Sequence, residues 1–270
     1  MKSNTLNNGI EMPSVGLGVW RTEDGQQVIT AIHHALEVGY RHVDTAMIYK
    51  NENGVGEALQ TANVPRDQVF LTTKVWNTDI RAGRAAQAID ESLTRLKTDY
   101  ADLILLHWPT EGYEAAWEAL EKALEVGKVR AIGLSNFMPD NLADILRVGS
   151  TVPAVNQIEL HPYLQQHDVQ AACAEHNIAI TAWSPLMQGK FLEEPLFVEL
   201  ADKYGKTAAQ VLLRWDLERN FITIPKSTNP GRIQQNFDLF DFSLSAEDVQ
   251  RINDLNRGQR FGPDPRNFDF

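Results

Sequence analysis

The chain has 270 residues, of which 43% are hydrophobic, an ordinary composition for a globular protein with a sizeable core. Its 25 basic and 36 acidic residues give a formal net charge of −11, which argues against nucleic acid or an anionic membrane surface as the main partner. The single cysteine, Cys173, excludes an intrachain disulfide and fits a reducing compartment.

The N-terminal segment MKSNTLNNGIEMP lacks the apolar region of a signal peptide, and no apolar run in the sequence is long enough to span a bilayer. We therefore expect a cytoplasmic protein without a membrane partner. Within this segment, Asn8-Gly9 lies between two short extended runs and is typical of a β-hairpin turn. The hairpin is expected to cap the bottom of the fold that follows.

After the hairpin, short apolar runs rich in β-branched residues alternate with longer runs of helical periodicity. The strand patterns are VGLGVW (15–20), RHVDTA (41–46), VFLTTKVW (69–76), DLILLHW (102–108), VRAIGLSN (129–136), AVNQIEL (154–160), IAITAWSPL (178–186) and FITIPKS (221–227). The helical patterns cover 24–38, 54–62, 83–96, 113–125, a stretch from 139, 168–176, 207–218 and 245–255. Gly39 and Gly127 stand where glycine commonly ends a helix, and the chain closes in a Pro- and Gly-rich coil.

Repeated alternation of strands and helices predicts parallel pairing with right-handed crossovers. Eight such units in a chain of this length favour a closed (β/α)8 TIM barrel of the α/β class over an open doubly wound sheet. No linker, repeat or low-complexity tract interrupts the pattern, so residues 1–270 are expected to form a single domain.

Nearly every predicted strand ends in a polar or aromatic side chain. In a TIM barrel the active site lies at the carboxyl ends of the strands. The side chains at these ends are Val19-Trp20, Asp44, Lys74 to Trp76, His107 to Pro109, Ser135-Asn136, Gln157 with Glu159, Trp183-Ser184 and Lys226-Ser227. One buried polar group can be a satisfied core residue, but eight at one rim indicate a functional site.

Four of these residues form a chemical set. Asp44 and Lys74, on adjacent strands, are expected to form an ion pair. Tyr49 follows Asp44 by five residues, and a lysine beside it is expected to lower the pKa of the phenol. A phenol tuned toward neutrality is a usable general acid. His107, on the next strand, could orient a carbonyl oxygen or relay a proton.

At these positions the sequence resembles the aldo-keto reductase family, over nearly the whole chain. The motifs that carry the resemblance are GYRHVDTA (39–46) with Tyr49, GKVRAIGLSNF (127–137), and IPKS (224–227) followed by Arg232 and Gln235-Asn236, with TTKVW and LLHWP between them. The chain is most similar to compact bacterial and yeast-like members that reduce diketogluconates, methylglyoxal and other small aldehydes and ketones.

The resemblance implies a catalytic tetrad of Asp44, Tyr49, Lys74 and His107. In such a site Tyr49 protonates the carbonyl oxygen as a hydride from the nicotinamide reaches the carbonyl carbon. The resemblance also implies that the substrate pocket is walled by Trp20, Trp76 and Trp108, together with Tyr49 and His107.

The cofactor implied by the resemblance is NADPH. Ser135, Asn136 and Gln157 are expected to hold the carboxamide, and Trp183 to stack on the nicotinamide. Fixed cations suit a phosphate, which favours NADPH over NADH. The other cofactor positions implied are Ser184 and Leu186 at the pyrophosphate, Lys226, Ser227 and Arg232 at the 2′-phosphate, Gln235 and Asn236 toward the adenine, and Gly18, Val19, Trp20, Asp44 and Thr228.

The sequence departs from the family where Val19 replaces a common threonine. The segment 187–192 and the C-terminal tail are both short, which predicts an open pocket for small substrates. Compact members of the family are mostly monomers, so the resemblance, rather than any feature of the sequence, implies a monomer. Alternatives remain for several residues: the Asp44–Lys74 pair could be structural, and Trp76 and Trp108 could be core aromatics.

Two other functions remain open at this stage. A barrel of this kind could bind a nucleotide as a sensor with slow turnover, although the full tetrad favours an enzyme. A metal-dependent hydrolase would need a His-x-His pair or a carboxylate cluster at the strand ends, and none is present, so no metal is expected.

Overall fold

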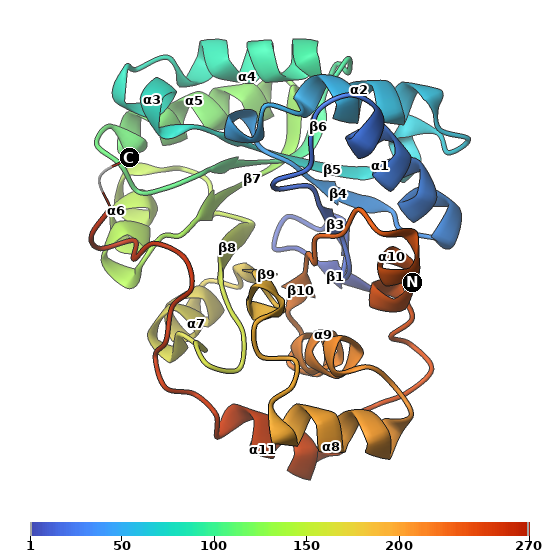
Figure 1. The fold of residues 1–270 in the computed structure, drawn as a ribbon. Coiled ribbons are helices and arrows are strands. Elements are labelled where there is room, and N and C mark those ends of the chain that lie inside the picture. Colours follow the sequence, from blue (N-terminus) through green and yellow to red (C-terminus); the bar gives the residue numbers. More distant parts are fainter. Residues whose placement is uncertain (1, 269) are drawn as a thin grey trace.

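A ring of parallel strands surrounded by helices forms the centre of the computed structural model, which describes residues 2–268 and 270 (Figure 1). Each of the eight strands pairs in parallel with the next one along the chain. They are β3 (Leu17–Gly18), β4 (His42–Asp44), β5 (Phe70–Val75), β6 (Ala101–Leu106), β7 (Val129–Ser135), β8 (Val155–Glu159), β9 (Ala179–Trp183) and β10 (Ile222–Thr223).

Backbone hydrogen bonds join the last strand to the first. The N–H of Gly16 donates to the oxygen of Thr223 at 2.9 Å, and the N–H of Gly18 donates to the oxygen of Pro225 at 3.2 Å. The predicted (β/α)8 barrel is therefore confirmed, and each predicted strand overlaps an observed one. That all residues form a single domain stays a prediction.

Helices surround the ring (Figure 1). They are α1 (Gln26–Val38), α2 (Glu52–Thr61), α3 (Asn77–Arg81), α4 (Ala85–Arg95), α5 (Tyr113–Glu125), α6 (Pro139–Val148), α7 (His167–Glu175), α8 (Pro195–Tyr204), α9 (Ala208–Glu218), α10 (Pro230–Phe237) and α11 (Ala246–Asn253). Gly39 and Gly127 follow α1 and α5 with φ of 121° and 76°, as predicted.

Helices α3, α8 and α10 were not predicted, and α4 begins at Ala85 rather than at residue 83. Helix α10 buries only two side chains, Ile233 and Asn236, so it leaves no apolar stripe to detect. The start of the helix is stabilised instead by its first residues. Pro230 stands in the first turn, and the Asn229 side chain accepts a hydrogen bond from the N–H of Arg232.

The predicted N-terminal hairpin is present, with β1 (Ser3–Thr5) antiparallel to β2 (Glu11–Pro13). It lies at the amino ends of the barrel strands. Leu6 and Met12 pack there with Phe70 and Val155, the first residues of β5 and β8. The hairpin therefore closes the bottom of the barrel, and the opposite rim is left for the strand-end side chains.

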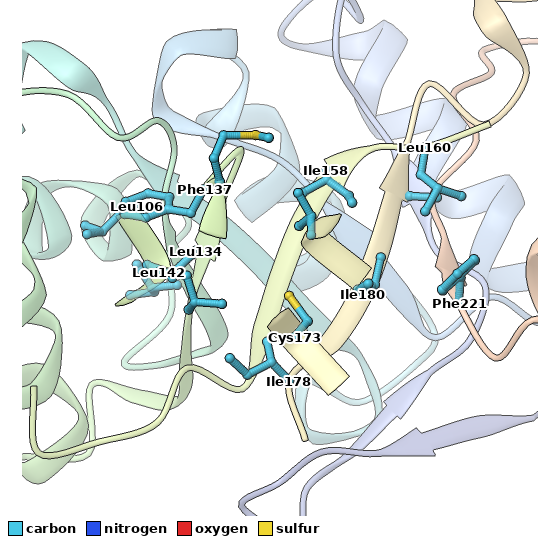
Figure 2. Packing of buried hydrophobic residues seen from close by; sticks show 14 of the residues in the cluster. Leu106, Leu134, Phe137, Leu142, Ile158, Leu160, Cys173, Ile178, Ile180 and Phe221 are labelled. Atoms are coloured by element: carbon cyan, nitrogen blue, oxygen red, sulfur yellow. The ribbon is translucent and has the colours of Figure 1, made fainter. Parts of the chain in front are cut away.

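The largest apolar cluster lies between the strands and the covering helices. Figure 2 shows part of it, with side chains from strands β6 to β9 meeting those of α6 and α7. The labelled members on the strands are Leu106, Leu134, Ile158 and Ile180, and those on the helices are Leu142 and Cys173. Burial raises the pKa of the Cys173 thiol to about 11, so this thiol is a packing group.

None of the helices in the described part of the chain is long and apolar enough to cross a membrane.

His42, on β4, is fully buried, and burial lowers its pKa to about 4. The unfolded chain binds a proton at this residue near pH 6.5, whereas the folded chain does not bind one until about pH 4. Stability is therefore fully present above pH 6.5 and is lost as the pH falls toward 4. We expect about 2 kcal/mol of the free energy of unfolding to be lost between pH 7 and pH 5.

Urea unfolding of the wild type and of His42→Asn at several pH values would measure this loss. The variant is expected to be less stable at pH 7 but to show a flatter dependence on pH. His176→Gln, at an exposed position, is the matched control and should keep the wild-type slope. An unchanged slope in His42→Asn would contradict the assignment.

Candidate active site

A short loop after β4 carries Tyr49 to the rim of the barrel. Asp44 ends the strand, and the N–H of Thr45 still donates to the oxygen of Thr72 on β5 at 2.9 Å. The chain then makes the 3-10 turn η1 (Met47–Tyr49), and Lys50 leaves it with a left-handed φ of 57°. The five-residue spacing between Asp44 and Tyr49 is thus one strand end followed by one tight turn.

Asn51 fixes the far end of this loop. Its buried side chain accepts a hydrogen bond from the Thr45 hydroxyl at 2.8 Å and donates to the oxygens of Val19 and Thr22 at 2.9 and 3.0 Å. These bonds join the Tyr49 loop to the end of β3, so the loop is held at both ends.

The expected ion pair between Asp44 and Lys74 forms inside the barrel. The Lys74 ammonium donates to Oδ1 of Asp44 at 2.6 Å and to the oxygen of Thr45 at 2.9 Å. Gln157 donates to the other carboxylate oxygen at 2.7 Å. The two charged side chains are 0% and 3% exposed, so both depend on these partners.

Tyr49 lies between the ion pair and His107. Its ring centroid is 5.1 Å from the Lys74 ammonium and 5.8 Å from the His107 ring. The prediction that Lys74 lowers the pKa of Tyr49 is wrong: burial, followed by the nearby Asp44 carboxylate, raises this pKa well above its usual value. Because Asp44 neutralises Lys74, burial dominates, and Tyr49 is a neutral phenol at physiological pH.

His107, directly after β6, is also uncharged. Burial, followed by the Lys74 charge, lowers the pKa of His107 well below its usual range. Its ring stacks edge-on against Trp76, with centroids 5.1 Å apart, and its Nδ1 is buried without a hydrogen-bond partner. A neutral imidazole in this position can donate one hydrogen bond and accept another.

A second set of polar side chains lies on the neighbouring strands β7 to β9. Asn136 has a left-handed φ of 65° and donates from Nδ2 to the oxygen of His107 at 3.0 Å. Its Oδ1 accepts a hydrogen bond from Nε1 of Trp183 at 2.8 Å. The Ser135 hydroxyl donates to the oxygen of Gln157 at 3.0 Å. The four residues expected at the nicotinamide are therefore connected.

Three cations, Lys226, Arg232 and Arg21, lie close together at the rim, near the end of β3 and the segment after β10. The pKa of Lys226 is lowered by burial first and then by the charges of Arg232 and Arg21. Within residues 2–268 and 270, none of the three makes an ion pair with an acid. Like charges brought together in this way suit an anionic ligand, so the site fits the phosphate end of a dinucleotide.

The structure brings the remaining predicted cofactor residues to the same rim. Gly18 joins β3 to the chain after β10, and Ser184, Leu186 and Trp183 are half-buried at the end of β9. The segment after β10 and helix α10 carry Ser227, Thr228, Gln235 and Asn236.

The C-terminal tail reaches two of the predicted pocket tryptophans. Phe270 stacks on Trp76 with ring centroids 5.8 Å apart, and both Phe268 and Phe270 contact Trp108, at 5.1 and 5.2 Å. Figure 1 shows the tail running from α11 past α6 to end near α3, where Arg81 donates to the main-chain oxygen of Phe270 at 2.8 Å. The tail therefore covers two of the tryptophans that were predicted to wall an open pocket. Trp20 remains 42% exposed, under the Arg21 guanidinium.

Sequence reasoning did not identify Asn51, Arg21, Phe268 or Phe270 as parts of this site. Asn51 and Arg21 lie two residues after Tyr49 and one after Trp20, so proximity to the predicted residues was the available signal. The tail aromatics gave no comparable signal, since the tryptophans that they contact are more than a hundred residues away in the sequence. Across the described residues, no group of three or more His, Cys, Asp or Glu side chains is placed to hold a metal ion.

Similarity to known proteins extends over almost the whole chain. The model of the family described as the aldo/keto reductase family matches residues 14–257. The 9,11-endoperoxide prostaglandin H2 reductase of Trypanosoma cruzi (strain CL Brener) is 48% identical over 268 residues, which cover 98% of this chain and 95% of that protein. The methylglyoxal reductase DkgA of Escherichia coli (strain K12) is 45% identical over 268 residues, covering 97% and 96%.

Solved structures agree with these relatives. The apo crystal structure of Gox0644 has a TM-score of 0.95 at 39% identity and covers 100% of this chain and 99% of its own. The Bombyx mori aldo-keto reductase in complex with NADP has a TM-score of 0.88 at 36% identity, covering 96% and 94%. Since a family model and relatives of nearly half-identical sequence extend along almost its entire length, the chain belongs to the aldo/keto reductase family and is an NADP(H)-dependent oxidoreductase.

Proposed function

We propose that this protein reduces small aldehydes and ketones, with keto-sugar acids and methylglyoxal-like carbonyls as its substrate class. The observation that carries the proposal is the buried Asp44–Lys74 pair, which lies beside the phenol of Tyr49 and the imidazole of His107. In this proposal, Tyr49 is the general acid that protonates the carbonyl oxygen.

Lys74 has a role that follows from its hydrogen bonds. An ammonium has three N–H donors, and two of them are used by Asp44 and Thr45. The third can serve the Tyr49 oxygen, where a negative charge develops as the proton leaves. Lys74 thus stabilises the product side of the proton transfer, although burial keeps the phenol protonated beforehand.

His107 orients the reacting carbonyl. Its neutral ring can donate an N–H to the carbonyl oxygen without competing as a proton source, because its pKa lies well below the physiological range. Trp76, which packs against it, limits the positions of that ring and forms part of the pocket wall.

The cofactor of the family is NADP(H), and when bound it supplies the hydride for carbonyl reduction. We assign its nicotinamide end to the connected Ser135, Asn136, Gln157 and Trp183, since Gln157 donates to Asp44 and the Trp183 indole donates to Asn136. Arg21 joins the sequence-predicted cations at the phosphate end. A cytoplasmic location and a monomeric state stay predictions from the sequence.

A carbonyl panel containing methylglyoxal, glyoxal and a keto-sugar acid would test this function. We expect NADPH to be consumed with at least one small carbonyl, as followed by the loss of its absorbance. Tight binding of NADPH with no turnover across the panel would contradict the proposed reduction and favour a sensor of the cofactor.

The cation cluster predicts a preference for NADPH over NADH. Arg232→Ala and Lys226→Ala are each expected to raise the KM for NADPH about tenfold, because a charged hydrogen bond to a phosphate is lost. The KM for NADH should change less than about twofold, since NADH lacks that phosphate. Steady-state kinetics with both cofactors measures the split, and Lys97→Ala at a distant exposed cation is the control. Equal changes for the two cofactors would refute the assignment.

A further inference from the structure

Glu159, the last residue of β8, is buried at the rim but has no part in the proton transfer. Its side chain is 0% exposed, and its backbone is in register with Trp183 on β9. Neighbouring residues in register point to the same face of a parallel sheet. Glu159 therefore lies beside the indole that is assigned to the nicotinamide.

The Glu159 carboxylate holds the C-terminal segment. Oε1 accepts hydrogen bonds from the N–H groups of Phe261 at 2.6 Å and Gly262 at 3.1 Å. His161 contacts the same oxygen at 3.2 Å, and the Arg260 guanidinium lies 3.8 Å from Oε2. Two consecutive backbone donors on one buried carboxylate fix the path of the chain at this point.

Gly262 is held directly against the indole of Trp183. A Cβ atom added at Gly262 would lie 2.3 Å from Cη2 and 2.9 Å from Cζ3 of that ring. The opposite edge of the ring is fixed by the bond from Nε1 to Asn136 at 2.8 Å. The indole is therefore held at both edges, on one side by a side chain of the barrel and on the other by the backbone of the tail.

From this arrangement we infer that Glu159 is a positioning residue, which sets the plane of Trp183 for the nicotinamide by clamping Phe261 and Gly262. The inference rests on the proposed function, because Trp183 matters to catalysis only if it stacks on the cofactor. The clamped segment also leads to Phe268 and Phe270, which cover the pocket wall. One carboxylate thus orders residues on both the cofactor side and the substrate side.

A double-mutant cycle tests whether Glu159 acts through Trp183. Glu159→Ala is expected to weaken NADPH binding about three- to tenfold, the usual worth of an aromatic stacking contact. In a Trp183→Ala background the same substitution should change the dissociation constant less than about twofold. A full effect in both backgrounds would overturn the inference.

Gly262→Ala separates positioning from folding. The added methyl group meets the indole while the Glu159 carboxylate remains, so this variant should reproduce the weaker NADPH binding. Asp248→Asn is the matched control, since Asp248 is a buried carboxylate that holds α11 to Lys203 far from the rim. It should lower the melting temperature without changing NADPH affinity. A Glu159→Ala variant that only loses stability, as this control does, would contradict the assignment.

Acrylamide quenching of tryptophan fluorescence gives a readout that needs no cofactor. The contribution of Trp183 is obtained by difference from Trp183→Phe in each background. It should become more quenchable in Glu159→Ala, and an unchanged value would overturn the positioning role. If the wild type neither binds NADPH nor reduces a carbonyl, the proposed function fails while this measurement still decides whether Glu159 holds the ring.

Discussion

Replacing Tyr49 with phenylalanine is expected to lower kcat for carbonyl reduction by about 10²–10⁴-fold, the usual contribution of a positioned general acid. The substitution removes the phenolic proton beside the ion pair and leaves the ring that packs against His107. The dissociation constant for NADPH should change little, because the phenol contacts the carbonyl rather than the cofactor. Steady-state kinetics and a binding titration measure the two quantities.

A control for this loss is Tyr113→Phe, which removes a hydroxyl that donates to Asp144 at 2.8 Å on the outer helices. It should keep wild-type kcat. Retention of more than about a third of the activity in Tyr49→Phe would show that another group supplies the proton.

The raised pKa of Tyr49 adds a pH dependence to this expectation. Because the acid is the protonated phenol, kcat should stay level through neutral and mildly alkaline pH and fall only where the phenol ionises, well above the usual tyrosine range. A fall in kcat near neutral pH that Tyr49→Phe abolishes would mean that Lys74 lowers the pKa after all.

Lys74→Met is expected to destabilise the protein by about 3–5 kcal/mol, because it leaves the Asp44 carboxylate buried without its counter-ion. Gln157 would remain as its one side-chain donor. The double variant Asp44→Asn/Lys74→Met removes both charges and should recover much of the lost stability. Both variants should lack activity, since both have lost the Lys74 ammonium that stabilises the Tyr49 oxygen. Urea unfolding and kcat together measure the difference.

Lys128→Met serves as the control for this pair. Lys128 and Asp90 also form a bridge of 2.6 Å, but their side chains are 42% and 56% exposed, so water replaces the lost partner and stability should hardly change. If the double variant were as unstable as Lys74→Met alone, the cost would come from packing rather than from an uncompensated charge.

Much of the barrel could be predicted because buried parallel strands leave a simple pattern. An apolar run such as LILL followed by His107 marks both the strand and its end, and the same reading placed Asp44 and Lys74 on neighbouring strands. Helix α10 gave no such pattern, since half of its eight residues are polar and it depends on a cap at Asn229.

The electrostatics of the site could not be predicted from residue types. The sign of the pKa shift at Tyr49 depends on burial and on how closely Asp44 neutralises Lys74, and neither is visible in a sequence. The same limit applies to the tail. The contact of Gly262 with Trp183 joins residues that are distant along the chain, and a glycine in a coil predicts only a turn.

The bonds that close the ring between Gly16 and Thr223 have a consequence for synthesis in the cell. The segment that completes the barrel emerges from the ribosome only after the seven other strands of the ring. Until then the nascent chain presents the open edge of β3, and an unpaired parallel edge is a template for wrong pairing. Co-translational folding must therefore stop short of the native topology, and the final closure step is the one during which molecular chaperones have a surface to protect.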